Sequence, residues 1–351
     1  MKNLRFLFLT FLSVSIFFTS CNDNGDDPKP AGKYDNGVFI SNEGIFQQGN
    51  GSVSFYDNEK DSVYNEIFRD ENAGVPLGDV VQSMARAGGK ILIAVNASSK
   101  VEIVKLSDFT HIATVNVSQP RYISVNGDKA YVSSWENKVY IIDLNSYLVT
   151  DSIETGTGPE GMLIAGGKLF IANSGGWALD STVTVVSLAD HSTNTVFVNA
   201  YCPSMLEADA DGNIWVLAKG NTIYDGNWNP IGDNPSYLVQ LSSDGSKVQK
   251  SVKLFDDQHP AKLDVNKAGT KLYYGSAWGL SGLYEFDITS SAAPSSPLID
   301  ELNYGFFVDQ ANDVIYLLQE AYTSNGKMIR YDSAGKKLSE FTVGLYPSGG
   351  C

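Results

Sequence analysis

Apolar and polar positions alternate along most of the chain in short segments. KVEIVKL (100–106), KVYIIDL (138–144) and TVTVVSL (182–188) are examples, and all are rich in Val, Ile or Tyr. A period of two places alternate side chains in a core, as in half-buried β-strands. The pattern therefore predicts β-strands throughout, and no long stretch has the period of a helix.

A unit of four such strands recurs along the sequence. QPRYISVNGDKAYVSS (119–134) aligns with GPEGMLIAGGKLFIAN (158–173), since each has a proline, an apolar strand, a turn with glycine and a strand that begins with lysine. A third alternating strand and a more polar fourth follow. The first two strands recur at 81–95, 202–218, 259–276 and 303–318. Four antiparallel strands in about 40 to 50 residues are typical of a β-propeller blade.

Six complete units begin near residue 78, and the two ends of the chain supply a seventh. GVFISNEG, GSVSFYD and SVYNEIF (37–68) provide its second, third and fourth strands, and LYPSGGC (345–351) provides its first. Such closure removes the exposed edges of an open sheet. We therefore expect an all-β fold, a single seven-bladed β-propeller over residues 37–351 closed by N- and C-terminal strands in one blade. Six- and eight-bladed rings are the alternatives.

The N-terminus has the build of an export signal. A short basic region precedes an apolar stretch (7–18) that is too short to span a bilayer comfortably, and small residues precede Cys21. The segment resembles a bacterial lipobox with Phe18 in place of the usual leucine. We expect a lipoprotein signal peptide over 1–20 and lipidation at Cys21, with an ordinary cleaved signal as the alternative.

Residues 21–36 are rich in Asn, Asp, Gly and Pro and predict a flexible tether. Acidic residues behind a lipidated cysteine resemble the surface-export signal of Bacteroidetes lipoproteins, which implies a lipid-anchored, surface-exposed position on the outer membrane. The formal charge of the chain is -15. Such acidity argues against nucleic acid or anionic lipid as a partner, because both attract basic patches.

Large aromatic residues gather in one family of loops. Antiparallel alternation places the loops between second and third strands on the same face as the loops that enter the first strands. The first family contains four of the five tryptophans, and its aromatic residues are Phe46, Trp135, Trp177, Tyr224, Trp228, Trp278 and Tyr322. The second family brings further candidates to the mouth of the central channel, namely Arg121, Glu160, His259 and Tyr304.

This distribution predicts a binding face. Each large ring buries about 150 to 250 Å², and an apolar patch of several rings suits a flat ligand with amide or hydroxyl edges. Gly175 and Gly176 precede Trp177 and allow a backbone conformation that displays it. The alternative is that each loop tryptophan only covers the end of a core. Trp215 lies within a strand, where we expect it to be a core or inter-blade residue.

The sequence offers little for catalysis. Its three histidines do not cluster with cysteines, so we predict no metal site and no cofactor. No Ser or Cys has a nearby base in a recognisable arrangement, and a pair formed by Arg121 and Glu160 is more often structural than catalytic. Cys202 and Cys351 are expected to be free thiols. We therefore predict a protein that is not an enzyme, with a lactonase-type hydrolase as the enzymatic alternative.

The repeated GDKAYVSSWENKVYIIDL and GPEGMLIAGGKLFIANSGG segments resemble the YncE-like propellers over essentially all of the mature chain. With a lipobox, an acidic tether and an aromatic loop face, the chain is most similar to the surface lipoproteins of gut Bacteroidetes in the BtuG group. This resemblance implies capture of cobalamin (vitamin B12), a broad and largely apolar ring fringed by amides, as a transported ligand. It also implies delivery to an outer-membrane TonB-dependent transporter. Glycan binding and protein docking by the same face are the alternatives.

Overall fold

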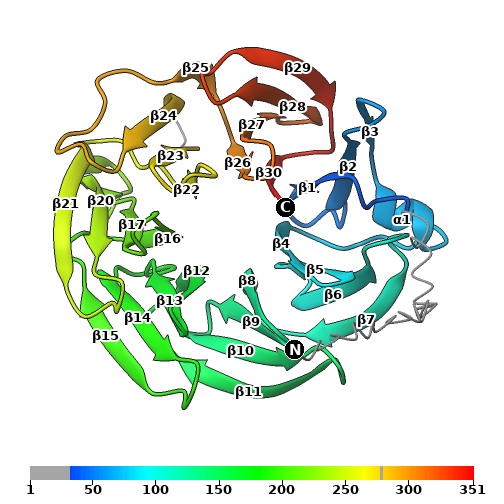
Figure 1. Cartoon of the computed structure of the whole chain (residues 1–351), viewed down its shortest axis with the longest axis horizontal. Coiled ribbons are helices and arrows are strands. Elements are labelled where there is room, and N and C mark those ends of the chain that lie inside the picture. Colours follow the sequence, from blue (N-terminus) through cyan, green and yellow to red (C-terminus); the bar gives the residue numbers. More distant parts are fainter. Residues whose placement is uncertain (1–31, 277–279) are drawn as a thin grey trace, which may run out of the picture. The chain divides into compact units, whose positions relative to one another are not determined.

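The computed structural model describes residues 32–276 and 280–351. The predicted signal peptide, the lipidation site Cys21, the first part of the predicted tether and Trp278 lie outside the described residues. The described residues form seven four-stranded antiparallel sheets, arranged as the blades of a β-propeller around a central axis (Figure 1). The predicted fold class and the predicted number of blades are confirmed.

Each blade is named here after its innermost strand, and its strands run outward in the order given. The β4 blade has β4 (Val81–Ala87), β5 (Lys90–Val95), β6 (Lys100–Lys105) and β7 (His111–Asn116). The β8 blade has β8 (Pro120–Asn126), β9 (Lys129–Ser134), β10 (Lys138–Asp143) and β11 (Leu148–Glu154). The β12 blade has β12 (Pro159–Ala165), β13 (Lys168–Asn173), β14 (Thr182–Ser187) and β15 (Thr193–Phe197).

The second half of the ring continues in the same way. The β16 blade has β16 (Pro203–Ala208), β17 (Ile214–Ala218), β20 (Ser236–Leu241) and β21 (Val248–Phe255). The β22 blade has β22 (Lys262–Val265), β23 (Lys271–Gly275), β24 (Ser281–Asp287) and β25 (Ile299–Leu302). The β26 blade has β26 (Gly305–Asp309), β27 (Val314–Ala321), β28 (Ser324–Asp332) and β29 (Lys337–Thr342).

The split blade closes the ring. Its strands are β30 (Pro347–Gly350), β1 (Gly37–Asn42), β2 (Ser52–Asp57) and β3 (Ser62–Tyr64). β30 pairs antiparallel with β1, with Gly350 opposite Ile40. The innermost strand of each blade contacts the innermost strand of the next, and β30 contacts both β26 and β4. The predicted closure by both ends of the chain is therefore confirmed.

The blades hold together through apolar side chains packed between neighbouring sheets. Trp215 of β17 is fully buried, and its ring meets Phe286 of β24 edge to face at 5.5 Å. Its indole N–H donates to a carboxylate oxygen of Asp209 at 2.9 Å, which satisfies its polar atom in the interior. The expected place of Trp215 between blades is confirmed. Removal of large side chains from water is the dominant favourable term for such packing.

Two elements differ from the predicted pattern. SVYNEIF forms only a three-residue strand, β3, and then enters a short helix, α1 (Ile67–Glu71). The strand ends because Glu66 adopts a left-handed conformation with φ 54°, which turns Ile67 and Phe68 into the core. The long loop between β17 and β20 contains an unpredicted hairpin of β18 (Asn221–Tyr224) and β19 (Pro230–Asn234).

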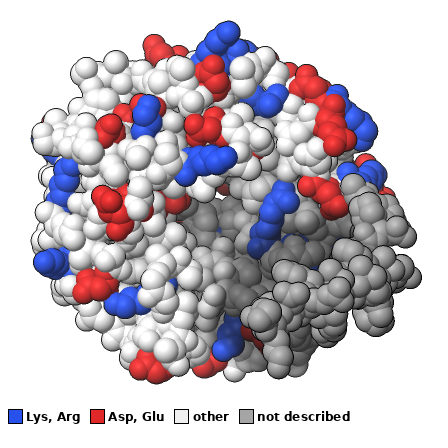
Figure 2. Space-filling model, in the orientation of Figure 1, with Lys and Arg blue, Asp and Glu red and all other residues white. Residues whose placement is uncertain are grey.

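Charged side chains are spread around the ring. Figure 2 shows acidic and basic residues interspersed on the face in view. No helix in the described part of the chain has the length and apolar character needed to cross a membrane. Cys202 and Cys351 are free thiols, as expected.

Candidate functional site

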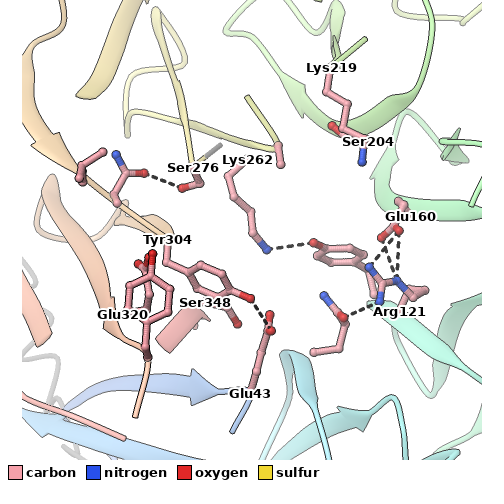
Figure 3. A pocket seen from close by; sticks show the side chains of 16 residues that line it. Glu43, Arg121, Glu160, Ser204, Lys219, Lys262, Ser276, Tyr304, Glu320 and Ser348 are labelled. Carbon is pink, nitrogen blue, oxygen red and sulfur yellow. Dashed lines mark hydrogen bonds and ion pairs between the residues drawn. The ribbon is translucent and has the colours of Figure 1, made fainter. Parts of the chain in front are cut away.

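A cavity of about 480 Å³ lies at the mouth of the channel, on the face that carries the loops between second and third strands. We call it the well (Figure 3). Its wall comes largely from equivalent positions of the repeat, because five of the seven blades contribute the second residue of the innermost strand. Five such residues line the well: Gln82, Arg121, Glu160, Ser204 and Ser348.

A sharp backbone turn places these residues at the mouth. Four of these five strands begin with proline. Proline has no backbone N–H to donate, and the first position of a strand does not require one. The residue before each strand is left-handed, with φ between 43° and 57°. These residues are Val80, Gln119, Gly158, Cys202 and Tyr346. The turn brings the chain into the channel wall, so the next residues face the well.

Arg121 and Glu160 form an ion pair in the wall. Arg121 Nε donates to both carboxylate oxygens of Glu160 at 3.1 Å, and Nη2 lies 3.0 Å from Oε1. Burial disfavours the charged guanidinium, but the charge and hydrogen bonds of Glu160, together with Tyr122 and Glu43, outweigh it and raise the pKa of Arg121. The guanidinium of Arg121 is therefore held in its charged form.

Trp135 contacts both members of this ion pair. Its indole N–H donates to Glu160 Oε1 at 2.9 Å, and the Arg121 guanidinium lies over its ring at 4.4 Å. The side chain is half-buried. Glu160 thus accepts from two partners at once, and the arrangement is that of a structural support for Trp135.

Lys262 and Tyr122 bridge the channel. Lys262 Nζ donates to the Tyr122 hydroxyl at 2.9 Å, although β22 and β8 belong to blades that are not neighbours. Burial opposes its charge, yet the phenol of Tyr122 and the carboxylate of Glu43 raise the pKa of Lys262. Glu43 accepts a hydrogen bond of 2.7 Å from Tyr304, whose pKa is raised by burial and by that carboxylate.

Two charged residues of the well stand apart from these pairs. Lys219 and Glu320 line the well, and neither side chain has a hydrogen-bond or ion-pair partner among the described residues. The backbone of Lys219 is fixed, because its N–H donates to Cys202 O at 3.0 Å and its carbonyl lies 2.9 Å from His259 Nδ1. A charge held in a cavity without a partner is suited to binding a ligand.

Trp177 forms part of a group of exposed aromatic side chains beside the well, which we call the aromatic rim. Its side chain is 93% exposed, and its ring meets Trp135 edge to face at 5.5 Å. Gly175 and Gly176 have φ of 92° and 60°, a backbone conformation that glycine adopts more easily than other residues, as the sequence predicts. A Cβ on Gly175 would lie 2.3 Å from Ala178 O. The tight loop therefore displays Trp177 beside the well.

The β18–β19 hairpin carries the second aromatic pair. Trp228 is 82% exposed, and its ring lies 6.1 Å from that of Tyr224. His259 holds this hairpin in place, because its Nε2 lies 3.0 Å from Asp233 Oδ1. His259 is absent from the lining of the well, so its geometry is that of a positioning residue.

Some of the remaining predicted residues line the well and others lie outside it. Tyr304 and Tyr322 line the well with Arg121 and Glu160, whereas Phe46 is exposed in the loop between β1 and β2. Sequence reasoning missed most of the other lining residues, among them Gln82, Tyr122, Lys219, Lys262 and Glu320. The position after the repeated proline could have indicated Gln82, which follows Val81 in the aligned unit. Nothing in the repeat marks Lys219 or Glu320.

The described residues contain no group of three or more His, Cys, Asp or Glu side chains placed to hold a metal ion. Fold and site thus define a β-propeller with a polar well beneath an aromatic rim. Residues 36–346 match the domain family described as "Domain of unknown function (DUF5074)", and the chain belongs to that family.

Solved structures share this fold. Hydrazine synthase of Kuenenia stuttgartiensis is similar with a TM-score of 0.62 and 17% identity, covering 82% of this chain and 90% of that one. Dihydro-heme d1 dehydrogenase NirN in complex with DHE is similar with a TM-score of 0.57 and 10% identity, covering 92% of this chain and 77% of that one. No curated protein sequence matches the chain. These likenesses concern the fold alone.

Proposed function

We propose that this protein is a capture protein that binds a large organic ligand on the aromatic rim above the well. The observation that carries the proposal is the display of Trp177 and Trp228, both almost wholly exposed, in loops on the same face. Other apolar side chains extend this rim, namely Phe46, Leu179, Tyr224, Ile231 and Tyr322. Monomeric proteins seldom leave such patches in water without a partner.

Cobalamin is the ligand that suits this face best. Its corrin ring is broad and largely apolar, so it fits an aromatic rim, and its fringe of amides fits hydrogen-bonding groups between the rings. The likeness of the sequence to the BtuG group of YncE-like propellers supports the same ligand. On this proposal the protein is anchored to the outer membrane through Cys21, exposed at the cell surface, and passes cobalamin to a TonB-dependent transporter.

The geometry of the well favours binding over turnover. Arg121 donates hydrogen bonds to the carboxylate of Glu160, and Glu160 also accepts from Trp135. Neither group is therefore poised to exchange a proton with a substrate.

A direct test is to mix the purified full chain with cobalamin and follow co-elution by the visible absorbance of the corrin. We expect cobalamin at micromolar concentration to elute with the protein. Free elution of all the cobalamin would contradict the proposed ligand. A glycan array on the same sample separates corrin binding from glycan binding, since sugar rings also stack on tryptophan.

Protein docking is the second candidate function, and the hairpin is the observation that favours it. Ile223 and Ile231 are exposed beside Tyr224 and Trp228, which makes an apolar tip suited to a protein surface. If docking is the function, a stable complex with the transporter forms without cobalamin, and Ile231→Ala weakens it. Size-exclusion chromatography of the mixture measures this.

A further inference from the structure

The charges around the well are divided between two sides. Lys219 and Lys262 form no direct ion pair with a carboxylate among the described residues, and they belong to the neighbouring β16 and β22 blades. Glu320 and Glu43 belong to the β26 blade and the split blade. Arg121 forms an ion pair with Glu160, so it adds no unpaired positive charge to the well. The well therefore has one side that attracts anions and another that accepts hydrogen bonds from N–H groups.

We propose that the well is a second subsite of the ligand site, in which Lys219 and Lys262 bind an anionic phosphodiester oxygen carried on an arm of the ligand. This inference rests on the proposed function, because cobalamin carries a phosphodiester in the nucleotide arm that hangs from its corrin ring. The ring lies on the rim while the arm enters the well. The carboxylates of Glu43 and Glu320 accept from amide N–H groups on the other side.

Lys219 is built to hold an anion. Both backbone polar groups of this residue are engaged, by Cys202 and by His259, so the base of the side chain is fixed. Its ammonium has no hydrogen-bond or ion-pair partner among the described residues. An ammonium with no competing partner gives up no hydrogen bond within the protein when it binds a ligand, which favours a charge-assisted hydrogen bond.

Lys262 supplies the second donor deeper in the channel. Its ammonium uses one N–H on Tyr122 and has further N–H donors for a ligand. The Tyr122 hydroxyl accepts from Lys262 and can still donate its own proton. Lysine and tyrosine donors at this depth suit the oxygens of a phosphodiester, which accepts hydrogen bonds but donates none.

The size of the well suits such an arm. About 480 Å³ is ample for a phosphate with an attached sugar, and too small for the whole of a corrinoid. A ligand that uses both rim and well must therefore combine a large flat ring with a narrower polar extension. Cobinamide has the same corrin ring but lacks the phosphodiester, ribose and base, so it is the matched probe.

Titration calorimetry of cobalamin and cobinamide on three full-chain proteins tests this proposal. The proteins are the wild type, Lys219→Met and Lys129→Met, the last a control because Lys129 is exposed at the start of β9 on the opposite face. We expect Lys219→Met to weaken cobalamin about tenfold or more, the usual loss for a hydrogen bond to a charged group, and to leave cobinamide unchanged. The control should match the wild type with both ligands.

The outcomes separate the two proposals. An equal effect of Lys219→Met on both corrinoids, or no effect on either, overturns the phosphodiester subsite while capture on the rim stands. Wild-type protein that binds neither corrinoid overturns cobalamin capture, and the subsite falls with it. Lys219 is preferred to Lys262 as the variant, because Lys262 also bridges the channel and its loss could disturb the fold.

Discussion

Trp135 and Trp177 look equivalent in the sequence, but their surroundings differ. Trp135 is half-buried, donates to Glu160 and lies against Arg121, whereas the indole of Trp177 makes no hydrogen bond with any described residue and is 93% exposed. An anchored ring supports the wall of the well. A displayed ring is available to a ligand, and stability measurements should tell the two apart.

Trp177→Ala should leave folding almost unchanged, since surface substitutions usually change the free energy of unfolding by less than about 0.5 kcal/mol. Trp135→Ala should lower that free energy by about 1–3 kcal/mol, because it removes a hydrogen bond to a charged group and a cation–π contact. Urea unfolding followed by far-ultraviolet circular dichroism measures both. A large loss of stability in Trp177→Ala would place that ring in the core.

At the scale of elements, the β18–β19 hairpin depends on contacts made at its base. His259 joins it to the rest of the β16 blade through Asp233 and the carbonyl of Lys219. The same contacts fix Lys219 at the well. The imidazole of His259 therefore connects the hairpin to the well. Loss of its hydrogen bonds should affect the positions of both.

His259→Ala should speed amide hydrogen exchange in β18 and β19 without a comparable change in the other blades. The physical reason is that local opening is favoured when an exposed element loses its anchoring hydrogen bonds. Hydrogen–deuterium exchange with mass spectrometry measures it. His191→Ala is the control, because His191 lies in a turn on the opposite face, 3.7 Å from Asp151. Equal exchange in the two variants would mean that His259 does not hold the hairpin.

The same element shows where sequence reasoning reaches its limit. The proline, the Gly-Lys turn and the alternating strands repeat, so the seven blades and their split closure follow from the sequence. Insertions such as the β18–β19 hairpin occur once and have no second copy to align. Lys219 and Glu320 face the well because of where their loops lie, which depends on packing between blades. Ile67 and Phe68 continue a strand pattern, yet as the first residues of α1 both side chains are buried in the core.

At the scale of the whole propeller, two acids within the ring make stability depend on pH. Glu207 of β16 and Asp264 of β22 lie on neighbouring innermost strands. Burial raises the pKa of Glu207 well above 4.5, and Asp264 adds to the shift. Burial likewise raises the pKa of Asp264 from 3.8 to about 6, against hydrogen bonds from Val308 and Val265. Both acids therefore bind protons more tightly in the folded state.

The stability that these two acids contribute should fall as the pH rises from about 4 to above 6, because they must release protons that the folded state binds more tightly than the unfolded chain. Glu207→Gln removes one of these groups. We expect the variant to melt at a higher temperature than the wild type at pH 7.5, and the difference to vanish near pH 4. Thermal melts across this range measure it. A constant difference between the two proteins would contradict the proton linkage.

If the aromatic rim captures the ligand, loss of its two most exposed tryptophans should weaken binding, and the dissociation constant of cobalamin for Trp177→Ala/Trp228→Ala measures this. Truncation of central aromatic residues in a binding face costs about 2 kcal/mol or more each, so we expect affinity to fall at least about a thousandfold. Leu148→Ala is the control, because Leu148 is 63% exposed on the opposite face. An unchanged dissociation constant in the double variant, with the control also unchanged, would contradict capture by the rim.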